Sequence, residues 1–123
     1  MSDFAVTKNI LIAASPEKVW RALTDLMMMP KWMSETEMTI STNWKVGDSI
    51  IFQGRWHKMR FRNVGIVLLF TPNKTLSYSH LSSLSRLPDT PENHSVLMFD
   101  LVPVDAGTAL TLTVSNSPTY EIH

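Results

Sequence analysis

The sequence predicts one α+β domain in which a curved antiparallel sheet closes around an apolar interior. Two observations support this prediction. A short segment with helix-start signals follows the first strand-like segment, at residues 15–24. From residue 35 onward, apolar and polar residues alternate with a period of two, in segments separated by short turns. Short turns between neighbouring strands imply antiparallel pairing. The 123 residues suit a single domain that spans residues 1–123.

Composition narrows the classes of function. Hydrophobic residues make up 44% of the chain, and 11 basic residues balance 11 acidic ones, so the summed charge draws the chain neither to nucleic acid nor to an anionic membrane. Cysteine is absent, which excludes disulfides, thiolate nucleophiles and zinc sites built on sulfur. The longest strongly apolar run, Val64–Phe70, is far shorter than the ~20 residues of a membrane span. The N-terminus shows no secretory pattern, so we expect a cytoplasmic protein without integral membrane association.

The first strand and the helix after it have the sharpest local signals. Residues Phe4–Ala13 alternate well enough for a strand. Ser15 is a suitable N-cap, Pro16 suits the first helical position, and Glu17 complements the positive end of the helix dipole. The helix should end near Thr24. The face that we expect to be buried carries Val19, Trp20 and Leu23.

A methionine-rich segment, Leu26–Met33, predicts a second short helix, which Pro30 splits or restarts. Four of its residues are methionines, whose unbranched side chains fill irregular gaps. Two interpretations stand side by side: a flexible lid over a ligand, or ordinary core filler between two helices.

The rest of the chain predicts a run of strands. We expect strands at residues 37–41, 49–57 and 59–71, and then around residues 76–80, 97–101 and 110–114. Turns fall at 46–48, 71–74 and 105–107, and residues 87–93 form a loop with two prolines. Gly65 predicts a bulge or a sharp bend within its strand. One sheet face is then apolar and aromatic, and the other is polar.

The apolar face of such a sheet needs a cover that two short helices are too small to provide. The chain stops at residues 117–123, where a threonine followed by Tyr-Glu-Ile is typical of a helix start. We therefore expect that the natural chain continues past His123 with a long helix, which this chain lacks, or that a partner chain supplies the cover. A homodimer is one arrangement of the second kind.

Several motifs resemble, in their order and spacing, the START/SRPBCC superfamily. Within it, the resemblance is to the branch named after the activator of the 90-kDa heat-shock chaperone's ATPase, and it covers almost the whole chain. No single motif decides it. The motifs are residues Ile12–Asp25, Trp32, Val46–Asp48, Gly65–Val67, Phe70–Asn73, Leu76–Tyr78, Leu87–Ser95 and Gly107–Thr113.

The resemblance implies a helix-grip (Bet v-like) fold, in which a bent antiparallel sheet wraps around a long C-terminal helix and leaves a cavity between them. Similar members bind lipids, sterols or polyketide-like aromatics, and some relatives are cyclases. The sequence departs from the pattern in lacking the gripping helix. It also departs at His80, where relatives often carry tryptophan.

These observations predict that the protein binds a hydrophobic small molecule in a pocket between the sheet and the helices. A plain aromatic core is the rival interpretation, because cores and apolar pockets use the same residues. A protein-interaction or co-chaperone-like module and a cyclase-type enzyme are the alternative functions. We predict no catalytic residue, no cofactor, no metal and no nucleic-acid partner. The predicted ligand-binding residues are Trp32, Phe52, Trp56, Phe61, Tyr78, His80 and Phe99.

Polar and basic residues suggest little chemistry. The four histidines lack metal-ligand spacing. His80 shares the apolar face with Tyr78 and is expected either to orient a ligand or act as a base, or to be a core histidine. The serines at 77–85 have no nucleophile elbow and no evident histidine–acid pair beside them, so hydrolase chemistry is not expected. The basic residues at 55–62 are interpreted as a solvated outer surface, with docking to anionic lipid or a partner as the lesser alternative.

Overall fold

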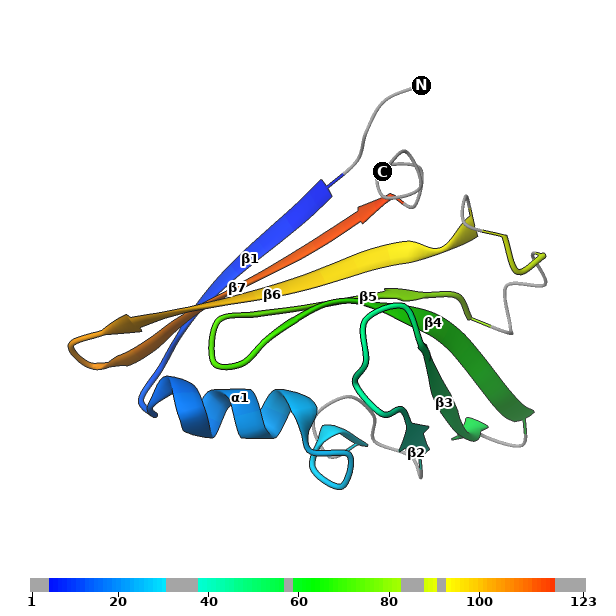
Figure 1. Cartoon of the computed structure of the whole chain (residues 1–123), viewed down its shortest axis with the longest axis horizontal. Coiled ribbons are helices and arrows are strands. Elements are labelled where there is room, and N and C mark those ends of the chain that lie inside the picture. Colours follow the sequence, from blue (N-terminus) through cyan, green and yellow to red (C-terminus); the bar gives the residue numbers. More distant parts are fainter. Residues whose placement is uncertain (1–4, 31–37, 57–58, 83–87, 91–92, 117–123) are drawn as a thin grey trace.

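In the described part of the computed structural model, a seven-stranded antiparallel sheet curves around one helix, in the strand order β1-β7-β6-β5-β4-β3-β2 (Figure 1). The structure describes residues 5–30, 38–56, 59–82, 88–90 and 93–116. Its elements are β1 (Ala5–Ile12), α1 (Pro16–Thr24), β2 (Met38–Ser41), β3 (Ser49–Trp56), β4 (Met59–Thr71), β5 (Thr75–His80), β6 (Ser95–Val104) and β7 (Gly107–Asn116). Apart from the crossing from β1 to β7, neighbours in the sheet are neighbours in sequence, as the short turns predict.

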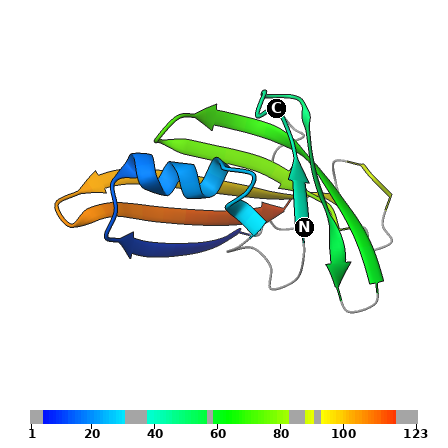
Figure 2. The ribbon, with the colours of Figure 1, turned by 90° about the horizontal axis from the view of Figure 1, so that it is seen from below.

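Helix α1 begins and is buried as the sequence predicts. The Ser15 hydroxyl accepts a hydrogen bond from the backbone N–H of Lys18 at 3.3 Å, and Pro16 opens the helix. The predicted face, which includes Trp20, is buried against the sheet. At the other end, the Trp44 indole N–H donates to the carbonyl of Thr24 at 2.8 Å and satisfies a helix-end acceptor. The helix lies across the part of the sheet that contains β6 and β7 (Figure 2).

The second helix is not confirmed. Residues 26–28 form a turn, and helical geometry begins only at Met29 and Pro30. The Asp25 carboxylate accepts the Met27 N–H at 2.8 Å, and the Asp25 carbonyl accepts the N–H groups of Met28 and Met29. This local bonding favours a turn over a continuous helix. Met29 is fully buried, whereas residues 31–33 lie outside the described part.

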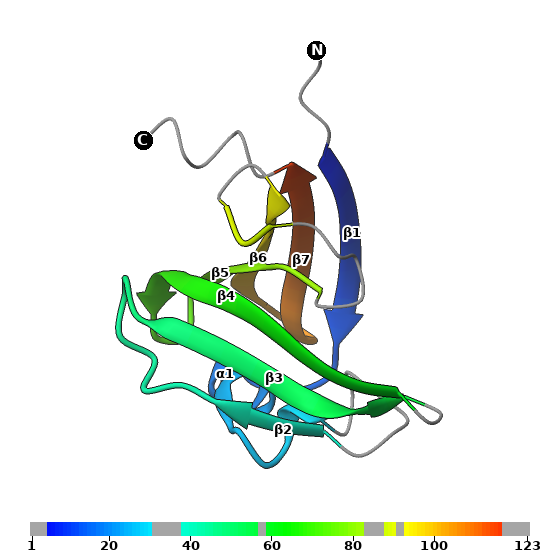
Figure 3. The same ribbon diagram turned by 90° about the vertical axis from the view of Figure 1, so that its right-hand side faces the viewer.

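Strand β4 joins the two halves of the sheet. It pairs with β3 over residues 59–66 and with β5 over residues 67–71, with a register shift between Val67 and Leu69. The irregularity predicted at Gly65 therefore lies just after it, between Val67 and Leu69. Gly65 itself is a position where the β4 backbone approaches the β5 backbone closely. A Cβ on Gly65 would lie 1.8 Å from the Ser79 carbonyl oxygen, so only glycine fits there. In Figure 3, β2, β3 and β4 cross in front of α1.

The predicted alternation gives the sheet two distinct faces. We call the face that carries Phe52 and Tyr78 the inner face and the opposite one the outer face. Directly paired residues share a face, so one apolar row crosses five strands on the inner side. The row consists of Val67, Tyr78, Leu97, Val114 and Val6. The sequence also predicted Phe4, Glu37 and His57 as strand residues, and these lie outside the described part.

The described residues cover this row unevenly. Val67 and Tyr78 are fully buried, but Val6 at the β1 end is 41% exposed. Ile10, four residues further along β1 and on the same face, is 56% exposed. The sequence predicts that a helix continuing past His123, or a partner chain, covers this face, and residues 117–123 lie outside the described part. Helix α1 therefore covers only part of the inner face.

Candidate functional site

Four rings meet on the inner face and form what we call the ring cluster: Phe52, Tyr78, His80 and Phe99. The centroid of the Phe52 ring lies 5.8 Å from that of Tyr78 and 5.3 Å from that of His80. The Tyr78 and Phe99 centroids are 6.1 Å apart. These separations are typical of favourable aromatic pairs. The cluster thus joins β3, β5 and β6, which are distant in sequence.

The Tyr78 hydroxyl is the exceptional atom of the ring cluster. Tyr78 is fully buried, and among the described residues nothing hydrogen-bonds to its hydroxyl. Burial raises the pKa of Tyr78 well above its usual value, so the group stays protonated and can donate. A buried hydroxyl without a partner costs roughly 1–3 kcal/mol. The site therefore presents an unused hydrogen-bond donor surrounded by apolar rings.

His80 lies at the edge of the ring cluster, with its ring edge-on to that of Phe52. Burial lowers the pKa of His80, and the nearby His94 lowers it further. The imidazole is therefore neutral at pH 7, with one donor and one acceptor nitrogen. This state allows His80 to orient a polar group or to accept a proton.

The structure brings together four of the seven predicted site residues. Phe61 is only half-buried; it stands opposite Gly54 in the β3–β4 hairpin, outside the ring cluster. Strand register explains this, because Phe61 pairs near the free end of the hairpin. Trp56 belongs to β3, but its side chain lies outside the described part, as does all of Trp32.

The apolar row leads from the exposed end of β1 to the ring cluster. Val6 pairs with Val114, Val114 with Leu97, and Leu97 with Tyr78. Exposure falls along this direction: Val6 is exposed, Val114 and Leu97 are half-buried, and Tyr78 is fully buried. The row and the ring cluster meet at Tyr78, whose side chain is fully buried.

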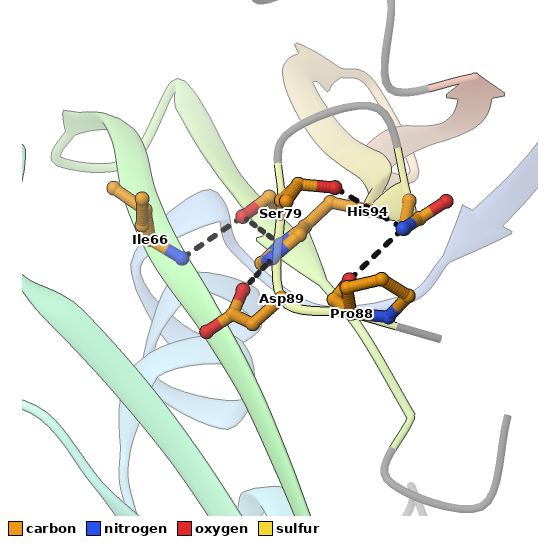
Figure 4. A network of polar contacts seen from close by, with 7 residues as sticks. Ile66, Ser79, Pro88, Asp89 and His94 are labelled. Carbon is orange, nitrogen blue, oxygen red and sulfur yellow. Dashed lines mark hydrogen bonds and ion pairs between the residues drawn. The ribbon is translucent and has the colours of Figure 1, made fainter. Parts of the chain in front are cut away.

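A second polar arrangement lies behind β5 (Figure 4). His94 Nδ1 is 2.9 Å from the Ser79 hydroxyl oxygen, and His94 Nε2 is 2.6 Å from an Asp89 carboxylate oxygen. The Ser79 oxygen also accepts the Ile66 backbone N–H at 3.0 Å. The tautomer that satisfies every contact carries its proton on Nε2, so that Ser79 donates to Nδ1.

This network corrects the expectation that no histidine–acid pair stands beside the serines. The pair was missed because strand register, rather than sequence spacing, brings His94 next to Ser79. The arrangement nevertheless lacks an accessible nucleophile, since Ser79 is fully buried and its oxygen already accepts a backbone N–H. These hydrogen bonds connect Asp89 and His94 to β4 and β5 and so stabilise their position against the sheet.

A shallow hollow of about 600 Å³ lies on the β2–β3–β4 part of the sheet, away from the ring cluster. Four of its six lining residues have their side chains on the outer face, and the other two, Gly54 and Phe61, lie between them along β3 and β4. The outer-face residues are Thr39, Gln53, Arg60 and Arg62. This hollow is polar and cationic, so it is not the apolar pocket that the sequence predicts.

In the described part of the chain, no group of three or more His, Asp or Glu residues could hold a metal ion. Among the same residues, no helix has the length and apolar character needed to cross a membrane.

Comparison with known families identifies the chain's relatives. The model of the family described as "Activator of Hsp90 ATPase homolog 1-like protein" matches residues 13–122. The chain belongs to this family. The match confirms the resemblance noted in the sequence, and the curved sheet agrees with a Bet v1-like fold. No curated protein matches the chain.

Solved structures share this architecture. The solution structure of ChR145 from Cytophaga hutchinsonii is 31% identical and superposes with a TM-score of 0.78, covering 96% of this chain and 80% of that one. A Rhodobacter sphaeroides protein is 25% identical with a TM-score of 0.75, covering 91% and 72%. Ara h 8.0201 is only 12% identical, with a TM-score of 0.75 over 94% and 78%, and so shows the fold alone.

Proposed function

We propose that this family member binds a hydrophobic small molecule, such as a lipid, a sterol or a polyketide-like aromatic, on the inner face of its sheet. The apolar part of the ligand lies along the row from Val6 to Leu97. Its polar group reaches the ring cluster and accepts a hydrogen bond from Tyr78. His80 supplies a second polar contact at the edge of the cluster.

The observation that carries the proposal is the buried hydroxyl of Tyr78, which has no hydrogen-bond partner among the described residues. Native proteins pair most buried polar groups, and the exceptions often mark functional sites. A ligand oxygen in this position would remove the desolvation cost of the hydroxyl. Phenylalanine would fill the same space without that cost, so the hydroxyl is better explained by binding than by packing.

The apolar row supplies most of the affinity in this scheme. Removing apolar surface from water contributes about 25 cal/mol per Å², so about 200 Å² of ligand surface contributes about 5 kcal/mol before ordering costs. Val6 and Ile10 are exposed on the inner face and offer such surface at the β1 end. Apolar pockets with a few polar groups are the usual form of small-molecule sites.

The proposal is tested by thermal shift and native mass spectrometry with oleate, cholesterol and naringenin as probes. At least one probe should bind in a 1:1 complex and raise the melting temperature. Val6→Asp places a charge on the inner row and should weaken that binding at least tenfold. Leu11→Asp is the matched control, because Leu11 lies on the outer face of the same strand and is 66% exposed. Absence of binding by all three probes, or equal losses in both variants, would contradict the proposal.

A co-chaperone-like interaction is the second candidate, and the family description favours it. The exposed side chains of Val6 and Ile10 would then contact a protein instead of a ligand. An ATPase assay with the 90-kDa chaperone decides between the two. Stimulated turnover that Val6→Asp removes would support this candidate, and unchanged turnover would reject it.

A further inference from the structure

Positive charge is concentrated in one part of this electroneutral chain. Residues 49–88 contain no aspartate or glutamate, although the whole chain has 11 acidic residues. The same stretch holds six of the 11 basic residues, so β3, β4 and β5 carry no carboxylate at all. The basic residues are Arg55, Lys58, Arg60, Arg62, Lys74 and Arg86. The zero net charge of the whole chain conceals a strongly cationic segment.

Strand register collects three of these arginines on the outer face of the β3–β4 hairpin. Arg55 stands directly opposite Arg60, and Arg62 is the next residue along β4 on that face. Arg62 in turn stands opposite Gln53, which pairs with Thr39 on β2. All five side chains are exposed. We call this set the arginine face; it contains the four outer-face side chains that line the hollow of about 600 Å³.

The arrangement of Arg55 and Arg60 is unfavourable in the isolated protein. Like charges directly opposite each other across two strands destabilise the pairing. Within the described ranges, neither guanidinium has an ion pair that would offset this repulsion. An external anion would do so, and the neighbouring amide of Gln53 and hydroxyl of Thr39 can donate further hydrogen bonds to its oxygens.

We propose that the arginine face docks this protein onto an anionic phospholipid bilayer. The guanidinium groups of Arg55, Arg60 and Arg62 contact lipid phosphates. The contact is peripheral and reversible. It uses the face of the sheet opposite the ring cluster, so it does not depend on ligand binding there.

The geometry favours a bilayer over other phosphate-bearing partners. The hollow is shallow and open, so a free phosphate ion would stay solvated and bind weakly. A bilayer presents many phosphates at once, and each basic side chain near it contributes about 1 kcal/mol. Single-stranded nucleic acid needs stacking rings among the cations, and Phe61, the aromatic residue between Arg60 and Arg62, points away from the arginine face.

Co-sedimentation of the full chain with unilamellar vesicles tests the proposal. The protein should bind vesicles of phosphatidylcholine with 30% phosphatidylglycerol at 50 mM NaCl, bind pure phosphatidylcholine at least tenfold more weakly, and dissociate at 300 mM NaCl. The double variant Arg55→Gln/Arg60→Gln should lower the partition coefficient about 25-fold, or about fivefold per guanidinium. Lys18→Gln/Lys45→Gln is the control, because it removes two exposed positive charges from elsewhere and should change binding less than threefold.

Three results would overturn the proposal. One is equal binding to both vesicle types, and another is an equal loss in the control variant, which would indicate a general charge effect. The third is preference for a single-stranded oligonucleotide, or for inorganic phosphate, over vesicles at the same phosphate concentration. Folding does not confound the test. Removing the opposed like charges should leave the melting temperature of the double variant unchanged or higher.

Discussion

Replacing Tyr78 by phenylalanine separates a ligand-binding hydroxyl from a structural one. In the unliganded protein, the variant loses a buried donor that has no hydrogen-bond partner among the described residues. A buried unpaired polar group costs roughly 1–3 kcal/mol, and the loss of the oxygen's packing contacts offsets a small part of this gain. We therefore expect Tyr78→Phe to raise the free energy of unfolding by about 1–2 kcal/mol. For a chain of this size, that corresponds to an increase in melting temperature of roughly 3–8 °C.

Ligand binding should change in the opposite direction. If Tyr78 donates to a ligand oxygen, the variant loses one hydrogen bond of about 0.5–1.5 kcal/mol, which weakens binding about two- to tenfold. The probes are naringenin, which carries phenolic oxygens, and flavanone, the same skeleton without the hydroxyl groups. Tyr78→Phe should weaken naringenin binding relative to flavanone. The assays are urea unfolding for stability and isothermal titration calorimetry for affinity.

The reasoning is refuted by a specific pair of results. A loss of more than 1 kcal/mol of stability in the unliganded variant would show that the hydroxyl has a structural partner. An unchanged affinity of Tyr78→Phe for naringenin would show that the hydroxyl does not contact the ligand. A stabilised variant with selectively weakened naringenin binding is the outcome that only a functional hydroxyl explains.

Three further predictions concern the sheet around the site. Gly65→Ala should cost about 2–3 kcal/mol in urea unfolding, because the new Cβ would lie 1.8 Å from the Ser79 carbonyl oxygen; a cost under 0.5 kcal/mol would show that the strands separate freely. Ser79→Ala should lower the free energy of unfolding by more than the matched variant Ser77→Ala, because it leaves both His94 Nδ1 and the Ile66 backbone N–H without their partner, whereas Ser77 donates to one carbonyl at 2.7 Å. Equal losses of stability in the two variants would contradict the network. The lowered pKa of His80 means that the unfolded chain binds a proton below about pH 6.5 before the folded chain does. The free energy of unfolding should therefore fall between pH 7.5 and 5 by more in the wild type than in His80→Gln, and parallel pH curves would reject this.

The sequence predicted those elements well that are stabilised by interactions between residues close together in the chain. The Ser15 cap and Pro16 fix the start of α1, and alternation places Phe52, Tyr78 and Phe99 on one face. These features depend on residues that are adjacent or two apart. For the segment after α1, the predicted second helix is not confirmed: residues 26–28 form a turn whose backbone N–H groups bond to Asp25, and residues 31–33 lie outside the described part.

Features that depend on pairing between distant strands were not readable from the sequence. The sequence spacing of Ser79, Asp89 and His94 does not predict their hydrogen-bond network, because the network depends on the register between β5 and β6 and on where the segment before β6 places Asp89. Phe61 alternates like Phe52, yet its position near the hairpin end keeps it from the ring cluster. Alternation predicts on which face of the sheet a side chain lies, but how deeply that side chain is buried depends on the elements that pack over it.

The charge balance shows a related limit of whole-chain averages. Equal numbers of acidic and basic residues argued against a long-range attraction to an anionic surface, and docking of the basic residues at 55–62 to anionic lipid remained only the lesser alternative. The structure shows that Arg55, Arg60 and Arg62 share one exposed face of a segment without carboxylates. Because screening limits electrostatic interactions to about 10 Å at ordinary ionic strength, the local arrangement matters more than the sum.

The central claim is that a ligand lies against the inner face and meets the Tyr78 hydroxyl. Intermolecular nuclear Overhauser effects between naringenin and the isotope-labelled full chain test it most directly. The account predicts contacts from naringenin to the rings of Phe52 and Tyr78 and to the methyl groups of Val6 and Leu97. Contacts confined to Phe61 and the outer face, with none to Tyr78, would contradict it.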